Sequence, residues 1–155
     1  MTAAKMTAAQ LRAAGIADDR PQRKPRVQRE LPYHMQVVNT LRHVLPGARI
    51  NHPPNELAMS GPTARNLIVK ARRMGMLKGF PDLTVLLPDG RTLYFEVKPP
   101  ADAALGRRAG RESTEQKELR EWAQSAGHLW AVVQGAPDVI DALQQWGVAM
   151  RGRIT

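Results

Sequence analysis

A β-hairpin signal near the middle of the chain constrains the fold more than any other feature of the sequence. Residues 88–90 have the sequence Pro-Asp-Gly and separate two short apolar runs, 82–87 and 92–97, a pattern typical of a tight antiparallel turn. With the turn centred on its aspartate, Asp82 and Glu96 each lie seven residues away and face each other in an uninterrupted ladder. A three-residue loop or a bulge would shift this register by one residue. The hairpin therefore predicts two facing carboxylates.

Side chains alternate along a strand, which divides the hairpin into two faces. Lys98 lies two residues beyond Glu96 and shares its face, which also carries Asp82. The other face is apolar and is predicted to pack on the core: Leu83, Val85, Leu87, Leu93, Phe95 and Val97. Facing Cβ atoms lie about 4.5–5.5 Å apart, so two like charges there are unfavourable unless a cation compensates them. Two acids and a lysine can hold Mg²⁺, activate a water and neutralise charge on a phosphate.

Each of these three residues also has an ordinary structural explanation. Pro-Asp is a common turn pair, and Glu-x-Lys on a strand is often a solvated alternation. Their coincidence in a chain with a net charge of +9 and a pI of about 10.8 favours a site. Such a charge predicts a polyanionic partner, which is either nucleic acid or an anionic membrane surface. No helix pairs a strongly basic face with a large apolar one, which disfavours the membrane.

The remaining pattern predicts an α/β fold with a mixed sheet. Helices are expected over 7–14, 32–45, 62–74, 113–126 and 137–146, and further strands over 48–52 and 129–133. The β-β-α-β order after residue 82 requires a parallel crossover beside the antiparallel hairpin, with helices packed on the sheet.

Three segments are expected along the chain. Residues 1–27 form a short helix and a basic, proline-containing arm, 28–150 the folded domain, and 151–155 a basic tail. The arm fits a solvated segment and a phosphate-contacting segment about equally well. The chain has no cysteine, which excludes disulfides and thiolate metal sites. No apolar run approaches the roughly 18 residues of a membrane span, and no secretory signal begins the chain, so we expect a cytoplasmic protein.

Three motifs in this sequence resemble those of the VRR-NUC branch of the PD-(D/E)xK nucleases. They are Gly-Phe-Pro-Asp-Leu at 79–83, Phe-Glu-Val-Lys at 95–98 and Ser-Thr-Glu-Gln at 113–116, and the segment 54–76 is similar as well. The resemblance covers about 30–146 and is specific as a set, although each motif alone is weak.

The resemblance implies a restriction-endonuclease-like core and hydrolysis of phosphodiester bonds with Mg²⁺ or Mn²⁺. It assigns Asp82, Glu96 and the Val97 carbonyl as metal ligands and Lys98 as the catalytic lysine. Stand-alone members resemble dimeric, structure-specific nucleases related to Holliday-junction resolvases. The resemblance therefore implies a homodimer acting on branched or flapped DNA, with RNA left open.

Two further site residues follow from the resemblance. Glu30 matches an acid that the family places on its first helix, and helical spacing sets it on the face of Val37 and Leu41. Pro32 disfavours helical geometry at the residue before it, so Glu30 is alternatively a surface charge preceding the helix. Gln116 matches a family glutamine, but its spacing from Ser113 also fits a capping box, which is the stronger single explanation.

Basic side chains close to the motifs are candidates for phosphate contacts, with a solvated surface as the alternative. They are Arg65, Lys70, Arg72, Arg73 and Lys78 before Asp82, and Arg107 and Arg108 in the loop 101–110. No histidine pair has zinc-type spacing, so no histidine metal site is expected. Trp122, Trp130 and Trp146 fall on predicted core stripes and are expected to pack in the interior.

Two functional hypotheses remain from the sequence. The leading one is a metal-dependent, structure-selective DNA endonuclease. It is expected to recognise the shape of its substrate, because the sequence has no signature of base-edge reading. The alternative is a basic nucleic-acid-binding module that keeps the fold without cutting. The intact Asp82, Glu96 and Lys98 count against the alternative, because a non-cutting protein has no reason to hold two carboxylates together.

Overall fold

A computed structural model describes residues 30–53 and 62–151, and for 62–65 the backbone alone. Its elements follow the order α2 (Leu31–Val44), β1 (Arg49–Asn51), α3 (Pro62–Arg73), β2 (Leu83–Leu86), β3 (Thr92–Val97), α4 (Thr114–Ser125), β4 (Leu129–Val133) and α5 (Ala136–Gln145). The expected helix over 7–14, the basic arm and the tail beyond residue 151 lie outside the described residues.

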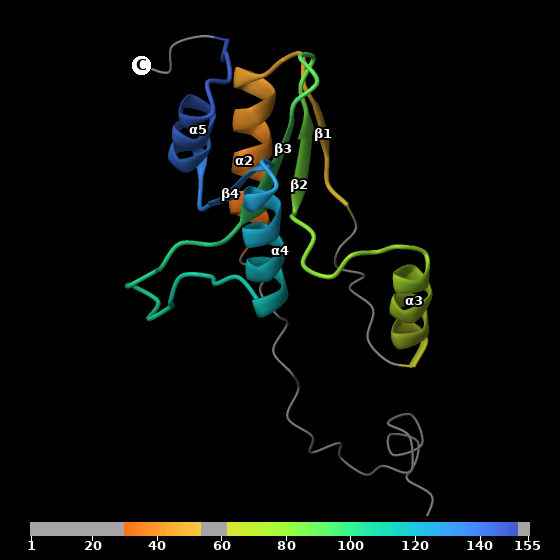
Figure 1. Cartoon of the computed structure of the whole chain (residues 1–155). Coiled ribbons are helices and arrows are strands. Elements are labelled where there is room, and N and C mark those ends of the chain that lie inside the picture. Colours follow the sequence, from red (N-terminus) through yellow and green to blue (C-terminus); the bar gives the residue numbers. More distant parts are fainter. Residues whose placement is uncertain (1–29, 54–61, 152–155) are drawn as a thin grey trace, which may run out of the picture.

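The strands form one sheet in the order β1-β2-β3-β4. The pairs β1-β2 and β2-β3 are antiparallel, whereas β3 and β4 are parallel because α4 returns the chain to the same end of the sheet (Figure 1). The mixed α/β sheet predicted from the sequence is confirmed.

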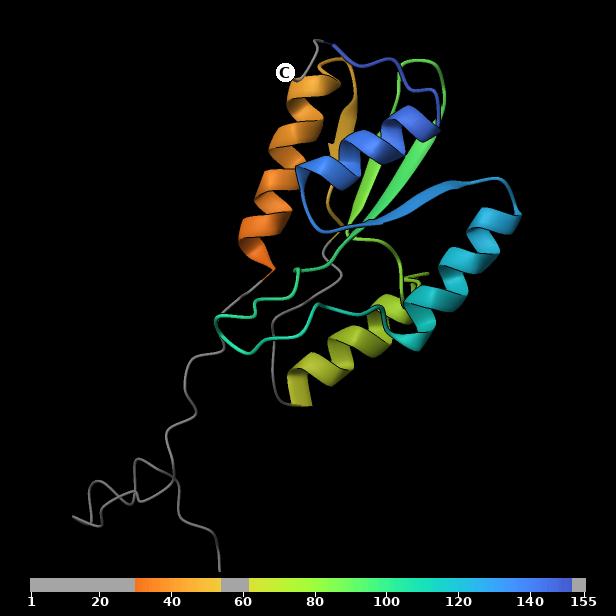
Figure 2. The same cartoon turned by 90° about the vertical axis from the view of Figure 1, so that its left-hand side faces the viewer.

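One face of the sheet carries the core. Helices α2 and α5 lie over it side by side (Figure 2), and the predicted apolar face of the hairpin is buried beneath them. Its six side chains are at most 8% exposed: Leu83, Val85, Leu87, Leu93, Phe95 and Val97. Hydrophobic burial at about 25 cal/mol per Å² makes this face the main source of stability.

The buried stripe of α2 is the helical face that carries Val37 and Leu41. Val37, Leu41 and Val44 are buried, Val38 packs partly buried against the core, and Met35 is 55% exposed. The buried residues are spaced i, i+4 and i+7, which places them on one helical face. Met35 precedes Val37 by two residues, about 200° around the helix, and therefore points away from the sheet.

The hairpin has the predicted register. Leu83 pairs with Phe95 and Val85 with Leu93, as a turn centred on residue 89 requires. Gly90 adopts a φ of +90°, which glycine reaches without steric cost. Arg91 binds the Asp89 carboxylate and donates to the Trp146 carbonyl at 2.9 Å, which fastens the turn to the end of α5.

Three segments meet at the opposite end of the sheet, where β2 begins and β3 ends. The first turn of α4, the loop 98–113 and α3 all lie towards this end in both views, and α3 covers neither face of the sheet (Figures 1 and 2). The predicted carboxylates lie at the same end, so these segments surround the candidate site. In the described part of the chain, no helix has the length and apolar character that crossing a bilayer requires.

Candidate active site

The end of the hairpin brings Asp82, Glu96 and Lys98 together. Continuing the β2-β3 register by one residue beyond Leu83 sets Asp82 opposite Glu96. The Val97 N–H donates to Asp82 Oδ2 at 2.9 Å, and Lys98 Nζ lies 2.5 Å from Glu96 Oε1. The two acids and the lysine therefore form one cluster, with Asp82 held by the strand that carries the other two.

Glu96 is completely withdrawn from solvent. Its exposed fraction is 0%, and the side chain of Lys98 is 11% exposed. Glu96 Oε1 accepts from both Lys98 and Gln116 Nε2, whereas Glu96 Oε2 is buried with no hydrogen-bond partner. A buried carboxylate oxygen without a partner costs about 1–3 kcal/mol or more, so its retention calls for a ligand that the described chain does not supply.

The electrostatics of the cluster follow from this burial. Burial and the neighbouring Asp82 charge raise the pKa of Glu96 to about 7, against the opposing influence of Lys98. Burial lowers the pKa of Lys98, but the hydrogen bond to Glu96 and the charges of Glu96, Asp82 and Glu30 outweigh it and raise that pKa overall. Lys98 is thus a cation at neutral pH. Glu96, with a pKa of about 7, can release its proton when another positive charge binds beside it.

Helix α4 holds Glu96 through Gln116. Ser113 caps the helix: its side chain accepts from the Gln116 N–H, and Gln116 Oε1 accepts from the Ser113 N–H at 2.8 Å. The other end of the same amide, Nε2, donates to Glu96. The predicted capping box is present, and Gln116 also contacts Glu96, because an amide can cap the helix with its oxygen and bind a carboxylate with its nitrogen.

The first turn of α4 is fastened to the segment that leads into Asp82. Lys78 forms an ion pair with Glu115, which lowers the pKa of that carboxyl. Gly79 has a φ of +82°, and a Cβ there would lie 2.7 Å from the carbonyl carbon and oxygen of Glu115. The glycine therefore permits the close approach that sets Asp82 and Gln116 around Glu96.

Gly79→Ala is expected to destabilise the domain by about 3 kcal/mol, since the positive φ costs about 1–2 kcal/mol and overpacking a similar amount. Gly75→Ala is the matched control, because Gly75 also has a positive φ, of +96°, but has nothing within 4 Å of its Cβ position. The control should lose about 1 kcal/mol. Urea unfolding measures both, and equal losses would show that the contact with α4 is unimportant.

The structure places the other predicted residues around the same end of the sheet. Glu30 is exposed at the start of α2, immediately before Leu31, and its charge reaches Lys98. Lys70, Arg72 and Arg73 are exposed on α3, and Arg108 is exposed in the loop 98–113, where Asp102 and Arg107 form a short bridge. Arg65 lies on α3, but its side chain is outside the described residues.

Four residues beside the site were not singled out from the sequence. His52 Nδ1 lies 2.6 Å from the Asp82 carbonyl oxygen, and the rings of His34 and His52 meet at 4.4 Å. Glu112 binds Arg120 through three contacts of 3.0–3.2 Å, and its charge contributes to the raised pKa of Glu96. For the two histidines, the available signal in the sequence was the Pro-Pro pair after His52, which marks the end of β1.

A divalent cation fits the cluster if the backbone contributes a ligand. Among the residues described, no three His, Cys, Asp or Glu side chains are grouped so as to hold a metal by themselves. The N–H and C=O of a strand residue point to the same side, and the Val97 N–H points to Asp82, so we expect the Val97 carbonyl there too. Asp82, the free oxygen of Glu96 and this carbonyl form an all-oxygen set suited to Mg²⁺ or Mn²⁺.

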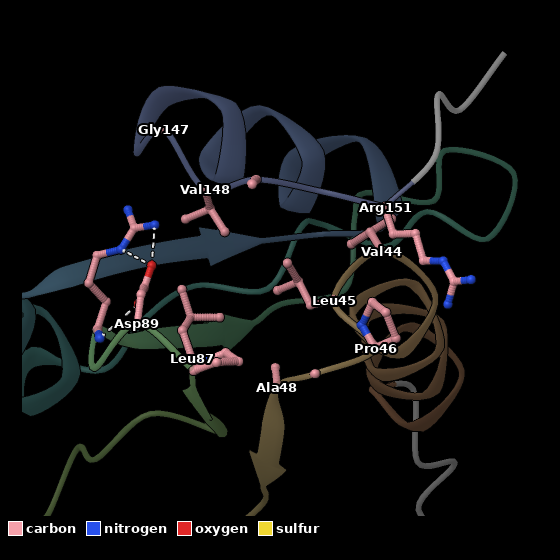
Figure 3. A pocket seen from close by; sticks show the side chains of 13 residues that line it. Val44, Leu45, Pro46, Ala48, Leu87, Asp89, Gly147, Val148 and Arg151 are labelled. Atoms are coloured by element: carbon pink, nitrogen blue, oxygen red, sulfur yellow. Dashed lines mark hydrogen bonds and ion pairs between the residues drawn. The ribbon is translucent and has the colours of Figure 1, made fainter.

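A cavity of about 340 Å³ lies at the opposite end of the sheet (Figure 3). It is lined by the end of α2, the hairpin turn and the segment 147–151, and its ionic groups include the paired Asp89 and Arg91. Because the hairpin separates it from Asp82 and Glu96 by the full length of β2 and β3, it is not part of the cluster.

The chain is similar to known proteins in its fold. No protein-family model matches the chain, and no curated protein matches it. A solved structure described as "VRR_NUC domain protein" is similar over 77% of this chain and 89% of its own, with 22% identity and a TM-score of 0.52. The chain has the VRR_NUC fold. A second structure, "VRR_NUC domain", covers 76% of this chain and 97% of its own at 17% identity and a TM-score of 0.49.

Within the VRR_NUC fold of this chain, the three sequence motifs converge. The 79–83 motif ends at Asp82, the 95–98 motif supplies Glu96 and Lys98, and the 113–116 motif supplies Gln116. The restriction-endonuclease-like core expected from the resemblance is confirmed by the mixed sheet and by the structural match.

The predictions for the three tryptophans have different outcomes. Trp130 is buried, and Trp146 packs partly buried against Phe95, as expected. Trp122 is 62% exposed, and the prediction of a core position was wrong. Ala123, its neighbour, is the buried residue, and adjacent helical positions are turned by about 100°, so Trp122 lies at the edge of the packed face.

Proposed function

We propose that this domain is a divalent-metal-dependent endonuclease that cuts DNA at branches, flaps or junctions. The observation that carries the proposal is the buried Glu96, which has an unpartnered oxygen and lies beside Lys98 and opposite Asp82. A folded protein rarely keeps such a group without a use for it, because a buried acid beside a second, partly buried acid is compensated only in part by one lysine.

Each residue of the cluster has a role in this proposal. Asp82, Glu96 and the Val97 carbonyl would hold Mg²⁺ or Mn²⁺. A bound divalent cation stabilises negative charge on the phosphate and lowers the pKa of a water molecule. Lys98 presents its ammonium beside the same acids, where it orients the attacking water and stabilises charge that develops on the phosphate. Gln116 fixes the orientation of Glu96, and Glu30 adds a further acid near Lys98.

The charge distribution supports a nucleic-acid substrate recognised by its shape. The net charge is +9, and exposed basic residues of α3 and the loop 98–113 lie at the same end of the sheet as the cluster. They would contact backbone phosphates, which position a duplex without reading its sequence. We further propose that the protein acts in the cytoplasm as a homodimer, since a two-fold axis would present two sites to two strands.

The test is a cleavage panel on linear, flapped and four-way DNA and on the matching RNA, with Mg²⁺, with Mn²⁺ and with chelator. Cleavage of branched DNA is expected with either cation and not with chelator. Asp82→Asn should lower the rate by about a thousandfold, because several kcal/mol of transition-state stabilisation depend on the cation. Asp141→Asn, the same change at an exposed position of α5, should leave the rate unaltered.

The panel also tests the alternative of a non-cutting module. A module predicts salt-sensitive binding that survives Asp82→Asn, with no product that depends on a metal. That result, obtained with folded wild-type protein on every substrate, would refute the nuclease proposal.

A further inference from the structure

The carbonyl group of Asp82 has an unusual hydrogen-bond partner. Asp82 directly precedes β2, and its carbonyl points towards β1. Nδ1 of the His52 ring lies 2.6 Å from the carbonyl oxygen of Asp82. A carbonyl oxygen can only accept, so Nδ1 of His52 carries the proton and donates. The side chain thus takes the place of a backbone donor at the end of the sheet.

The sequence of β1 explains why a side chain is needed. The β1-β2 ladder pairs Asn51 with Thr84, and two more residues along this register Pro53 lies opposite Asp82. In this ladder the residue opposite would donate its N–H to the Asp82 carbonyl, and proline has none. Backbone carbonyls at a sheet end require a partner, and His52 supplies it from the position just before the proline.

A second histidine fixes the first. His34 lies in the first turns of α2, is half-buried, and meets the ring of His52 edge to face at 4.4 Å between ring centroids and an interplanar angle of 62°. This packing restricts the rotation of an otherwise exposed His52. The core helix α2 is thereby linked through two rings to the backbone of Asp82.

We propose that His52 is a positioning residue for the metal ligand Asp82, with His34 as its support; this inference rests on the proposed function. Asp82 is held on one side by the Val97 N–H at its carboxylate and on the other by His52 at its carbonyl. These two bonds fix the peptide unit and the side chain, so the carboxylate keeps its place opposite Glu96 before a cation arrives. Groups that orient a metal ligand typically contribute a factor of about 10–100 to metal affinity.

Two substitutions of His52 distinguish the effect of its N–H donor from the effect of its ring. His52→Leu fills the space without a donor, whereas His52→Asn keeps an N–H group close to the Nδ1 position. His43→Leu is the matched control, because His43 is exposed near the other end of α2. Calorimetric titration with Mn²⁺, at a pH above the Glu96 pKa of about 7, measures the affinity without requiring cleavage.

We expect His52→Leu to weaken Mn²⁺ binding about tenfold, His52→Asn to restore it within about threefold, and His43→Leu to leave it unchanged. Cleavage by His52→Leu should recover at saturating Mn²⁺, with KM for the nucleic acid unaltered. Unchanged binding in His52→Leu, together with weakened binding in Asp82→Ala, would overturn this inference alone, as would a His52→Asn variant as weak as His52→Leu. Binding that Asp82→Ala leaves unchanged would overturn the proposed metal site as well.

An independent measurement examines the tautomer. The ring nitrogen resonances of His52, recorded about two pH units above the ordinary histidine pKa, should show a proton on Nδ1 and none on Nε2. A proton on Nε2 would leave the Asp82 carbonyl without this donor and would refute the positioning role.

Discussion

Lys98→Met is expected to lower kcat for DNA cleavage by about a thousandfold and to leave KM within about threefold, because the lost interaction exists mainly in the transition state. The geometry gives the reason. The side chain of Lys98 is 11% exposed and its ammonium lies 2.5 Å from Glu96 Oε1, so it is directed into the cluster and not towards bulk solvent. A charge at that place stabilises a reacting phosphate and contributes little to the initial capture of DNA.

The control for this variant is Lys117→Met. Lys117 lies on α4 with a side chain 63% exposed, and its ion pair with Glu121 spans 3.8 Å. Both variants remove one positive charge from the chain, so a difference between them depends on position and not on net charge. Single-turnover cleavage with saturating Mg²⁺ provides the comparison, and circular dichroism verifies folding. Equal slowing of cleavage in the two variants would mean that Lys98 contributes only to the net positive charge and has no specific role in the cluster.

The sequence predicted the hairpin and its acids well because the physical constraints there are local. A Pro-Asp-Gly turn fixes the register over the residues that flank it, and alternating apolar residues decide which face is buried. Asp82 and Glu96 are separated by only 14 positions, and the turn between them leaves little freedom. The capping box of α4 is local in the same way, and the spacing of Ser113 and Gln116 predicted it.

The residues that the sequence did not reveal depend on contacts between distant segments. His52 is 30 positions away from Asp82 in the sequence, and the pairing of β1 with β2 brings the two residues together. Part of the chain between these two strands lies outside the described residues. His34 joins it only because α2 packs across the core face. The missing N–H of Pro53 explains this bond once the register is known, but no local pattern predicts which strand will lie beside Asp82.

Exposure at helix edges was the other source of error. In α4 the buried position is Ala123, and Gln116 also faces the sheet, seven residues earlier. Trp122 lies beside that line, and hydrophobicity alone placed it inside. A helix that packs through one narrow flank leaves large residues at its margin exposed, and the width of that flank is set by the neighbouring strand and not by the helix sequence.

The metal-free protein is expected to lose stability as the pH rises towards and through 7, and a divalent cation is expected to restore it. The pKa of Glu96 is raised from 4.5 to about 7 by burial and by Asp82. A folded-state pKa above the unfolded value means that the folded protein binds the proton more tightly. The contribution of Glu96 is therefore fully present below about pH 4.5 and is lost as the pH rises through about 7.

The expected loss is about 3 kcal/mol, since each unit of pKa shift corresponds to about 1.4 kcal/mol. Other groups also titrate in this range, so the measured quantity is the difference in unfolding free energy between wild type and Glu96→Gln, from urea titrations in chelator. That difference should fall between acidic and mildly alkaline pH, because glutamine does not ionise.

Saturating Mg²⁺ should abolish most of the fall in wild type and have little effect on Glu96→Gln. The cation binds the ionised carboxylate in the folded state, and at about a hundred times its Kd such binding adds about 2.7 kcal/mol. The acidic limb is the internal control, because protonated Glu96 is a poor ligand and Mg²⁺ should not stabilise the protein there. A difference that stays constant across the pH range, or an equal Mg²⁺ effect on both proteins, would mean that the buried carboxylate is not the group that the cation neutralises.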